Sequence, residues 1–214
     1  VPVEVGGYNA SIDAVLNGRA DAAGGACNSP PFLRIEASPR GLRWPELPHA
    51  DAEAVARVRA RLPWYVPHVA IEGPTINAEG IEVFSSAYPF LVALDSSDET
   101  LVYSMVKVML EHFDEFKGNA PGANGWAIDR QKFDQAFVPY HPGAIRYFKE
   151  IGIWSEAAER THQANLQRQQ VLQDAWDAYL PGAPEDYDAF EQGWLRARES
   201  SLAAAGLITL GEGL

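Results

Sequence analysis

The residues best suited to contact a small solute are Cys27, Asn28 and Ser29, which follow a run of small residues. Asn28 offers two hydrogen-bond donors and an acceptor, and Ser29 adds a hydroxyl. We predict a strand over residues 20–25, and ligands in open α/β sheets lie at the carboxyl ends of strands. These side chains therefore predict a ligand contact. The alternative is a turn closed by local bonds between side chains and backbone.

Two further places are candidates for the same solute. Tyr8 and Asn9 lie at the start of a predicted helix, where unpaired backbone N–H groups favour anions. The alternative is that Asn9 only caps this helix. Tyr88 could form one wall of a cleft, although such a side chain more often belongs to the core.

The sequence predicts no metal centre, no cofactor and no catalytic residue. Cys27 is the single cysteine, which excludes an internal disulfide and a cysteine-based zinc site. A cysteine nucleophile needs a nearby histidine, and the five histidines lie in unrelated settings. His141 precedes Pro142, which indicates a structural turn. Asp98 and Glu99 resemble paired carboxylates, but helix capping explains them, and we expect a protein that is not an enzyme.

Length, charge and hydropathy narrow the class of protein. The 214 residues, 47% of them hydrophobic, suit one large or two small domains with a substantial core. No apolar run reaches the ~20 residues that a membrane-spanning helix needs. The opening lacks both Met and the features of a signal peptide, so we interpret the chain as a processed or truncated product. The net charge of −12 repels phosphate backbones, and no nucleic-acid partner is expected.

These candidates need strands and helices to position them, and the pattern of the first part indicates an α/β fold. Residues 1–5 predict a strand, and a helix capped by Asn9 follows, with Gly18 at its C-terminal end. With the strand at 20–25 this opening would be a βαβ-like unit. Further elements are predicted as a helix from Asp51, a strand at 65–71 and one or two strands within 81–94.

The rest of the chain predicts helices. Ser96 and Glu99 match a capping box, which places a helix start at Ser96. Further helices are expected from Asp129 and over residues 144–150, the latter ending at Gly152. Two long helical patterns then cover residues 154–180 and 184–202.

Three segments carry a resemblance to a known family. Residues 5–23 resemble the strand, helix and Asp-Ala strand of type 2 periplasmic binding proteins. Residues 99–107, with Tyr103 and Lys107, resemble the Val-Tyr-x-x-x-Lys helix of the TAXI family of TRAP-transporter solute receptors. Residues 140–152 resemble the His-Pro-Gly-Ala signature of that family.

The resemblance implies a type 2-like periplasmic receptor that closes on a small solute and passes it to TRAP membrane subunits. The family's known solutes are small acids, so an organic acid or amino acid is expected. Residues 1–35 would belong to lobe II, residues 36–153 to the crossover and to elements associated with lobe I, and residues 154–214 to a helical extension. The N-terminal lobe would be missing, and the family's Gly-Thr-Tyr appears here as Gly73-Pro74-Thr75-Ile76.

Two other functions remain open at this point. An effector-sensing domain of a regulatory protein would share the Asp-Ala strand pattern at residues 20–25. A hydrolase that uses Cys27 would lose turnover when the thiol is blocked.

Overall fold

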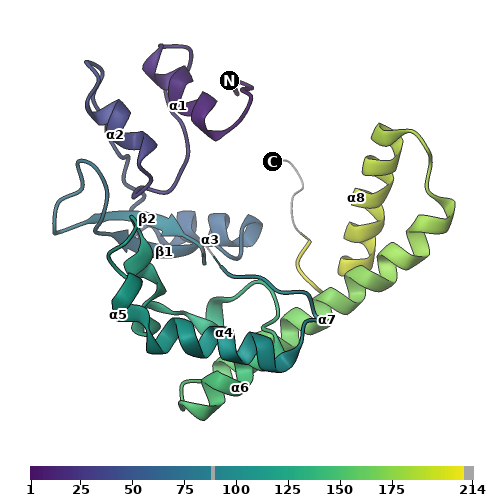
Figure 1. Ribbon diagram of the computed structural model, residues 1–214. Helices are drawn as coiled ribbons and strands as arrows, with labels where there is room; N and C mark the ends of the chain where they lie inside the picture. Colours follow the sequence, from purple (N-terminus) through teal and green to yellow (C-terminus); the bar gives the residue numbers. More distant parts are fainter. Residues whose placement is uncertain (88–89, 210–214) are drawn as a thin grey trace. The chain divides into compact units, whose positions relative to one another are not determined.

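The computed structural model describes residues 1–87 and 90–209, so the predicted contact Tyr88 lies outside the described residues (Figure 1). The α-helices are α1 (Tyr8–Leu16), α2 (Pro31–Glu36), α3 (Ala52–Arg61), α4 (Glu99–Glu111), α5 (Phe113–Phe116), α6 (Pro142–Glu150), α7 (Glu156–Tyr179) and α8 (Tyr187–Ala204). The strands are β1 (Val66–Ala70) and β2 (Ile81–Ser85), and the short 3-10 helices are η1 (Ala123–Trp126), η2 (Ile128–Arg130), η3 (Phe133–Gln135) and η4 (Leu180–Gly182). Among the described residues, no helix is long and apolar enough to span a membrane.

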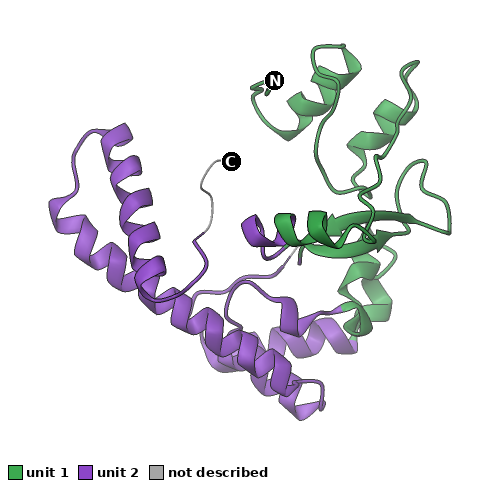
Figure 2. Ribbon diagram, turned by 180° about the vertical axis from the view of Figure 1, so that it is seen from behind, with its two compact units in different colours: residues 1–57, 65–86, 112–130 green, residues 58–64, 87–111, 131–214 purple. Residues whose placement is uncertain are grey.

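The chain forms two compact units, which Figure 2 colours separately. Unit 1 comprises Val1–Arg57, Tyr65–Ser86 and His112–Arg130. Unit 2 comprises Val58–Trp64, Ala87–Glu111 and Gln131–Leu214. The division expected at residues 35 and 153 concerns the lobes of a complete receptor and stays a prediction.

Helices α1 and α2 form the core of unit 1. The i, i+3 spacing of Ile12 and Val15 places both on one face of α1, where they meet Phe32 and Ile35 of α2. Phe32 is buried and packs at 4.6 Å against the ring of Trp44. The predicted first helix is thus confirmed, and Gly18 follows it with a φ of 71°, as its predicted place at the helix end requires.

Strands β1 and β2 pair antiparallel, with His68 opposite Val83. The N–H of Leu47 donates to the carbonyl of Glu82, so this carbonyl points away from β1. In an antiparallel ladder, residue pairs that exchange backbone hydrogen bonds alternate with pairs that do not. Glu82 and its partner Val69 form a pair without such bonds, and so do Pro67 and Phe84, two positions along the ladder. The missing N–H of Pro67 therefore costs no hydrogen bond between the strands. The strands predicted at 65–71 and within 81–94 are confirmed here.

The strands predicted at residues 1–5 and 20–25 are wrong. Neither stretch forms a strand, and neither has a strand partner among the described residues. A strand is stable only when a neighbouring strand takes up its N–H and C=O groups, and an apolar run does not supply that neighbour. The expected βαβ-like opening is instead a packed pair of helices.

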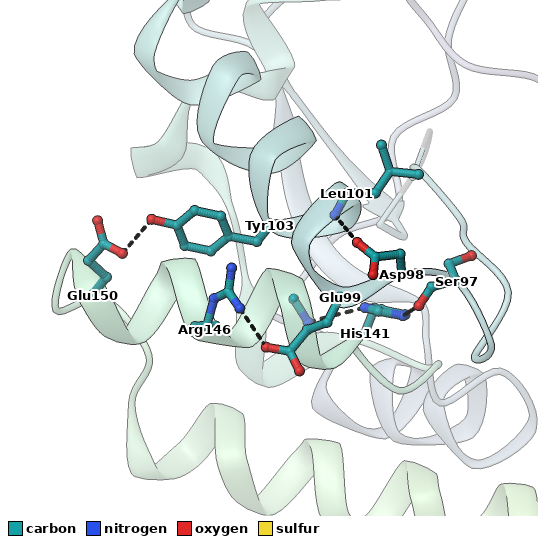
Figure 3. A network of polar contacts seen from close by, with 9 residues as sticks. Ser97, Asp98, Glu99, Leu101, Tyr103, His141, Arg146 and Glu150 are labelled. Carbon is teal, nitrogen blue, oxygen red and sulfur yellow. Dashed lines mark hydrogen bonds and ion pairs between the residues drawn. The ribbon is translucent and has the colours of Figure 1, made fainter.

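Two of the three segments that carry the family resemblance lie in α4 and α6 of unit 2, and these helices pack against each other (Figure 3). Arg146 binds Glu99 at 2.9 Å and lies 4.0 Å from the centre of the Tyr103 ring, whose hydroxyl donates to Glu150 at 2.6 Å. The approach requires Gly143, since an added Cβ would overlap the carbonyl of Glu99.

His141 has the structural role that its position predicted. It is the N-cap of α6, and its Nδ1 accepts the N–H of Gly143 at 3.1 Å. Its Nε2 contacts the carbonyl of Ser97 at 3.2 Å (Figure 3). The helix predicted at 144–150 is confirmed, and Gly152 follows it with a φ of 73°.

The capping box predicted at Ser96 is wrong. Helix α4 begins at Glu99, and the carboxylate of Asp98 accepts the N–H of Leu101 at 2.8 Å. Asp98 therefore serves as the cap, while Glu99 turns to Arg146 instead of reaching back. Asp98 thus has a capping role, whereas Glu99 takes no part in the cap and is held by the ion pair with Arg146.

The helix predicted from Asp129 is also wrong, because the segment folds into the short turns η2 and η3. The backbone carbonyls of residues 134, 136 and 138 accept hydrogen bonds from side chains of α7 instead of from a helix of their own. Thr161 donates to the carbonyl of Asp134, and Asn165 donates to the carbonyls of Ala136 and Val138. Packing on α7 thus overrides the local periodicity.

The two long C-terminal helices are confirmed as α7 and α8, which pack as a hairpin. Ser155 and Asp186 cap their N-termini through side-chain oxygens. Trp176 and Trp194 meet at 4.9 Å across the hairpin, and Phe190 closes the cluster. These aromatic side chains thus pack against one another between the two helices.

Candidate functional site

The predicted contact residues lie in a tight turn of unit 1, directly before α2. The N–H of Ser29 donates to the carbonyl of Ala26 at 2.9 Å, and the N–H of Phe32 donates to that of Ser29. Cys27, Asn28 and Ser29 are all half-buried. Pro31 begins α2 at a position where its missing N–H is not needed, so the turn is fixed by the helix that follows.

Two glycines from distant segments lie against this turn. A Cβ at Gly73 would lie 2.6 Å from the carbonyl oxygen of Cys27. A Cβ at Gly122 would lie 2.8 Å from Nδ2 of Asn28. Both glycines also have positive φ values, 139° and 79°, which side chains disfavour. At Gly73 the obstructing atom belongs to the backbone, so residues 72–74 can reach the turn only because this position carries no side chain. At Gly122 the obstructing atom ends a movable side chain, and the positive φ is what favours glycine.

Glu72 and Asn124, from these two segments, form a charged and polar trio with Arg130 of η2. Nδ2 of Asn124 donates to Oε1 of Glu72 at 2.8 Å, and Nη1 of Arg130 contacts the same oxygen at 3.3 Å. Glu72 and Arg130 keep side-chain exposures of 36% and 41%, so solvent reaches both. Oδ1 of Asn124 is buried and has no hydrogen-bond partner among the described residues.

The turn behind Glu72 is held in a strained conformation. Thr75 has a φ of 62°, which is unfavourable for a β-branched residue. The N–H of Ile76 closes the turn on the carbonyl of Gly73 at 3.2 Å. The indole of Trp44 donates to the carbonyl of Pro74 at 2.9 Å, which anchors the turn to the core of unit 1.

Burial and charge set the protonation of two groups near the trio. Burial raises the pKa of the Cys27 thiol, the backbone amides of Asn28 and Cys27 act against this rise, and the charge of Glu72 adds to it. Burial lowers the pKa of His68, and the charges of Arg130 and His49 lower it further. At neutral pH, Cys27 is therefore a thiol and His68 is uncharged.

Of the two contacts predicted at the start of the first helix, Tyr8 lies near the residues before the Cys27–Ser29 turn, and Asn9 does not cap the helix. The hydroxyl of Tyr8 would lie 2.8 Å from a Cβ at Gly25, so Tyr8 covers the residues leading to Cys27. Asn9 is exposed within α1 and does not cap it, because the N-cap is Gly7 and no side-chain cap bond forms. The predicted cap at Asn9 is therefore wrong, since the N-cap lies two residues earlier, at Gly7.

Glu72, Asn124 and Arg130 were not predicted from the sequence. They lie 52 and 58 residues apart along the chain, measured from Glu72, and no local spacing connects them. Glycines beside polar residues, at Glu72-Gly73 and at Gly122-Ala123-Asn124, are the signal that could have found them.

The trio and the turn together form a polar surface with charges of both signs. A guanidinium group has five donors, of which the contact with Glu72 uses Nη1, and the fork of an arginine matches a carboxylate. Amide groups at Asn28 and Asn124 can hold neutral polar atoms. No cluster of metal ligands occurs in the part of the chain that the structure describes. This arrangement is suited to binding a small polar molecule.

Comparison with known proteins and protein families identifies the family of this chain. Neither the curated proteins nor the solved structures contain a match to it. Residues 2–152 match the NMT1-like family, which is periplasmic-binding-protein-like and related to TRAP/TAXI solute receptors. The match includes the turn, the trio and the packed pair α4 and α6. Because it spans well over half of the sequence, the chain belongs to the NMT1-like family.

Proposed function

We propose that this chain is the solute-binding receptor portion of a TRAP-type transport system. It captures a small carboxylate in the periplasm and delivers it to the membrane subunits of the transporter. The family points to solute binding in general. The observation that supports the finer proposal is the half-exposed guanidinium of Arg130 on Glu72, a residue that also binds the amide of Asn124 and precedes Gly73, which lies against Cys27.

The proposed protein binds its solute without converting it. Catalysis by Cys27 would need a thiolate. Burial and the charge of Glu72 raise the pKa of this thiol, so it stays protonated at neutral pH. The ring of His141 is engaged elsewhere, since its Nδ1 accepts the N–H of Gly143 in the cap of α6. These observations support a receptor rather than a hydrolase.

Calorimetry with a panel of monocarboxylates, dicarboxylates and amino acids tests the proposal. We expect one class of carboxylate to bind with a 1:1 stoichiometry. Nuclear magnetic resonance spectra of that solute, recorded after prolonged incubation with the protein, should show it unchanged. A product signal would contradict the receptor proposal, and so would the absence of binding by every member of the panel.

A further inference from the structure

The ion pair between Arg130 and Glu72 joins a single pair of atoms. Nη1 of Arg130 meets Oε1 of Glu72 at 3.3 Å, and both side chains are more than one-third exposed. Exposed pairs of this kind contribute little to stability. A fork-shaped guanidinium binds a carboxylate best through two parallel bonds, so a better-placed carboxylate can displace Glu72.

Glu72 keeps its position without Arg130. Asn124 donates to the same Oε1 at the shorter distance of 2.8 Å. The next residue, Gly73, lies against the carbonyl of Cys27, and the indole of Trp44 holds the carbonyl of Pro74. Release of Arg130 therefore breaks one weak contact and leaves this oxygen of Glu72 with a donor.

We propose that Glu72 occupies, on Arg130, the place that the carboxylate of the solute takes. Glu72 is then an exchangeable counter-ion. It pairs with the guanidinium of Arg130 when no solute is bound, and it competes with the solute carboxylate for that guanidinium. This inference rests on the proposed function, because it assigns the anchor within the same site. It makes Arg130 the anchor of the acid group and Glu72 a residue that limits affinity.

The test uses succinate and its uncharged diamide, succinamide, as calorimetric probes. Glu72→Gln keeps an oxygen for Asn124 but removes the competing charge, so we expect succinate to bind about two- to five-fold more tightly. Succinamide should bind equally to both proteins. Asp13→Asn breaks another exposed pair of unit 1, Asp13 with Arg34 at 2.6 Å, and should leave both affinities unchanged.

A second variant tests the anchor itself. Arg130→Lys keeps the charge and loses the fork, and succinate should bind about three- to ten-fold more weakly. Unfolding midpoints of all variants identify any loss of fold.

The inference is overturned if Glu72→Gln binds succinate no more tightly, if succinamide gains equally, or if Arg130→Lys has no effect. It is also overturned if neither wild type nor Glu72→Gln binds succinate while another member of the panel binds, which leaves the receptor proposal standing. If no member of the panel binds, the receptor proposal itself fails.

Discussion

Gly143→Ala tests the close packing of α4 and α6. The added Cβ would overlap the carbonyl of Glu99 and lie 2.8 Å from the backbone nitrogen of Tyr103. Overpacking costs about 1–3 kcal/mol, and the upper end applies because the obstructing atoms are backbone atoms of α4. Alanine regains at most about 1 kcal/mol through its better helix propensity. The free energy of unfolding should therefore fall by about 2 kcal/mol.

Urea unfolding followed by tryptophan fluorescence measures this loss. Trp154 stacks on Phe148, a buried residue of α6, so its emission reports on the same cluster. Gly182→Ala is the matched control in unit 2, because a Cβ there meets no atom within 4 Å. The control should change the free energy of unfolding by less than about 0.5 kcal/mol. If Gly143→Ala unfolds at the same urea concentration as the control, the close approach of α4 and α6 does not exist as described.

Three further changes test other parts of the structure. Asp98→Ala should cost about 1 kcal/mol through loss of the α4 cap, whereas Ser96→Ala should be neutral; equal urea midpoints for the two variants would contradict this start of α4. Thr75→Gly should stabilise the fold by up to about 1 kcal/mol, since its φ of 62° suits glycine, and a lower urea midpoint would refute the strain. Burial lowers the pKa of His162, whose Nδ1 accepts the N–H of Tyr140, so the unfolded chain takes up this proton first as the pH falls. The stability that His162 contributes above pH 6.5 should be lost below it, and His162→Gln should flatten urea midpoints measured between pH 7.5 and 5.5.

Helices could be predicted from the sequence where their own residues specify them. Helices α6, α7 and α8 combine an apolar period with a capping residue or a glycine end, and both signals are local. The strands at residues 1–5 and 20–25 failed because a strand needs a partner, and the pairing is not written in the strand itself. The segment after Asp129 failed because side chains of α7, Thr161 and Asn165, supply its hydrogen bonds.

The candidate site also contains one part that follows from a local pattern and another that depends on contacts between distant segments. The turn at Asn28 could be predicted from a local pattern of polar residues after small ones, while its contact with a solute stays a prediction. Glu72 and Asn124 could not, because Gly73 and Gly122, both at positive φ, bring their segments to the turn over long sequence separations. Arg130 could not either, because its contact with Glu72 spans 58 residues. A glycine shows that a close approach is possible, but it does not show which segment approaches.

The affinity of Asn28→Ala for the carboxylate that the panel identifies decides whether the turn before α2 binds the solute. Loss of one hydrogen bond to a charged group should weaken binding by roughly 1.5–3 kcal/mol, or about ten- to a hundred-fold. Asn17→Ala, which removes an exposed asparagine after α1, should bind as the wild type does. An unchanged affinity in a folded Asn28→Ala protein would contradict the assignment of the site to the Cys27–Asn28 turn.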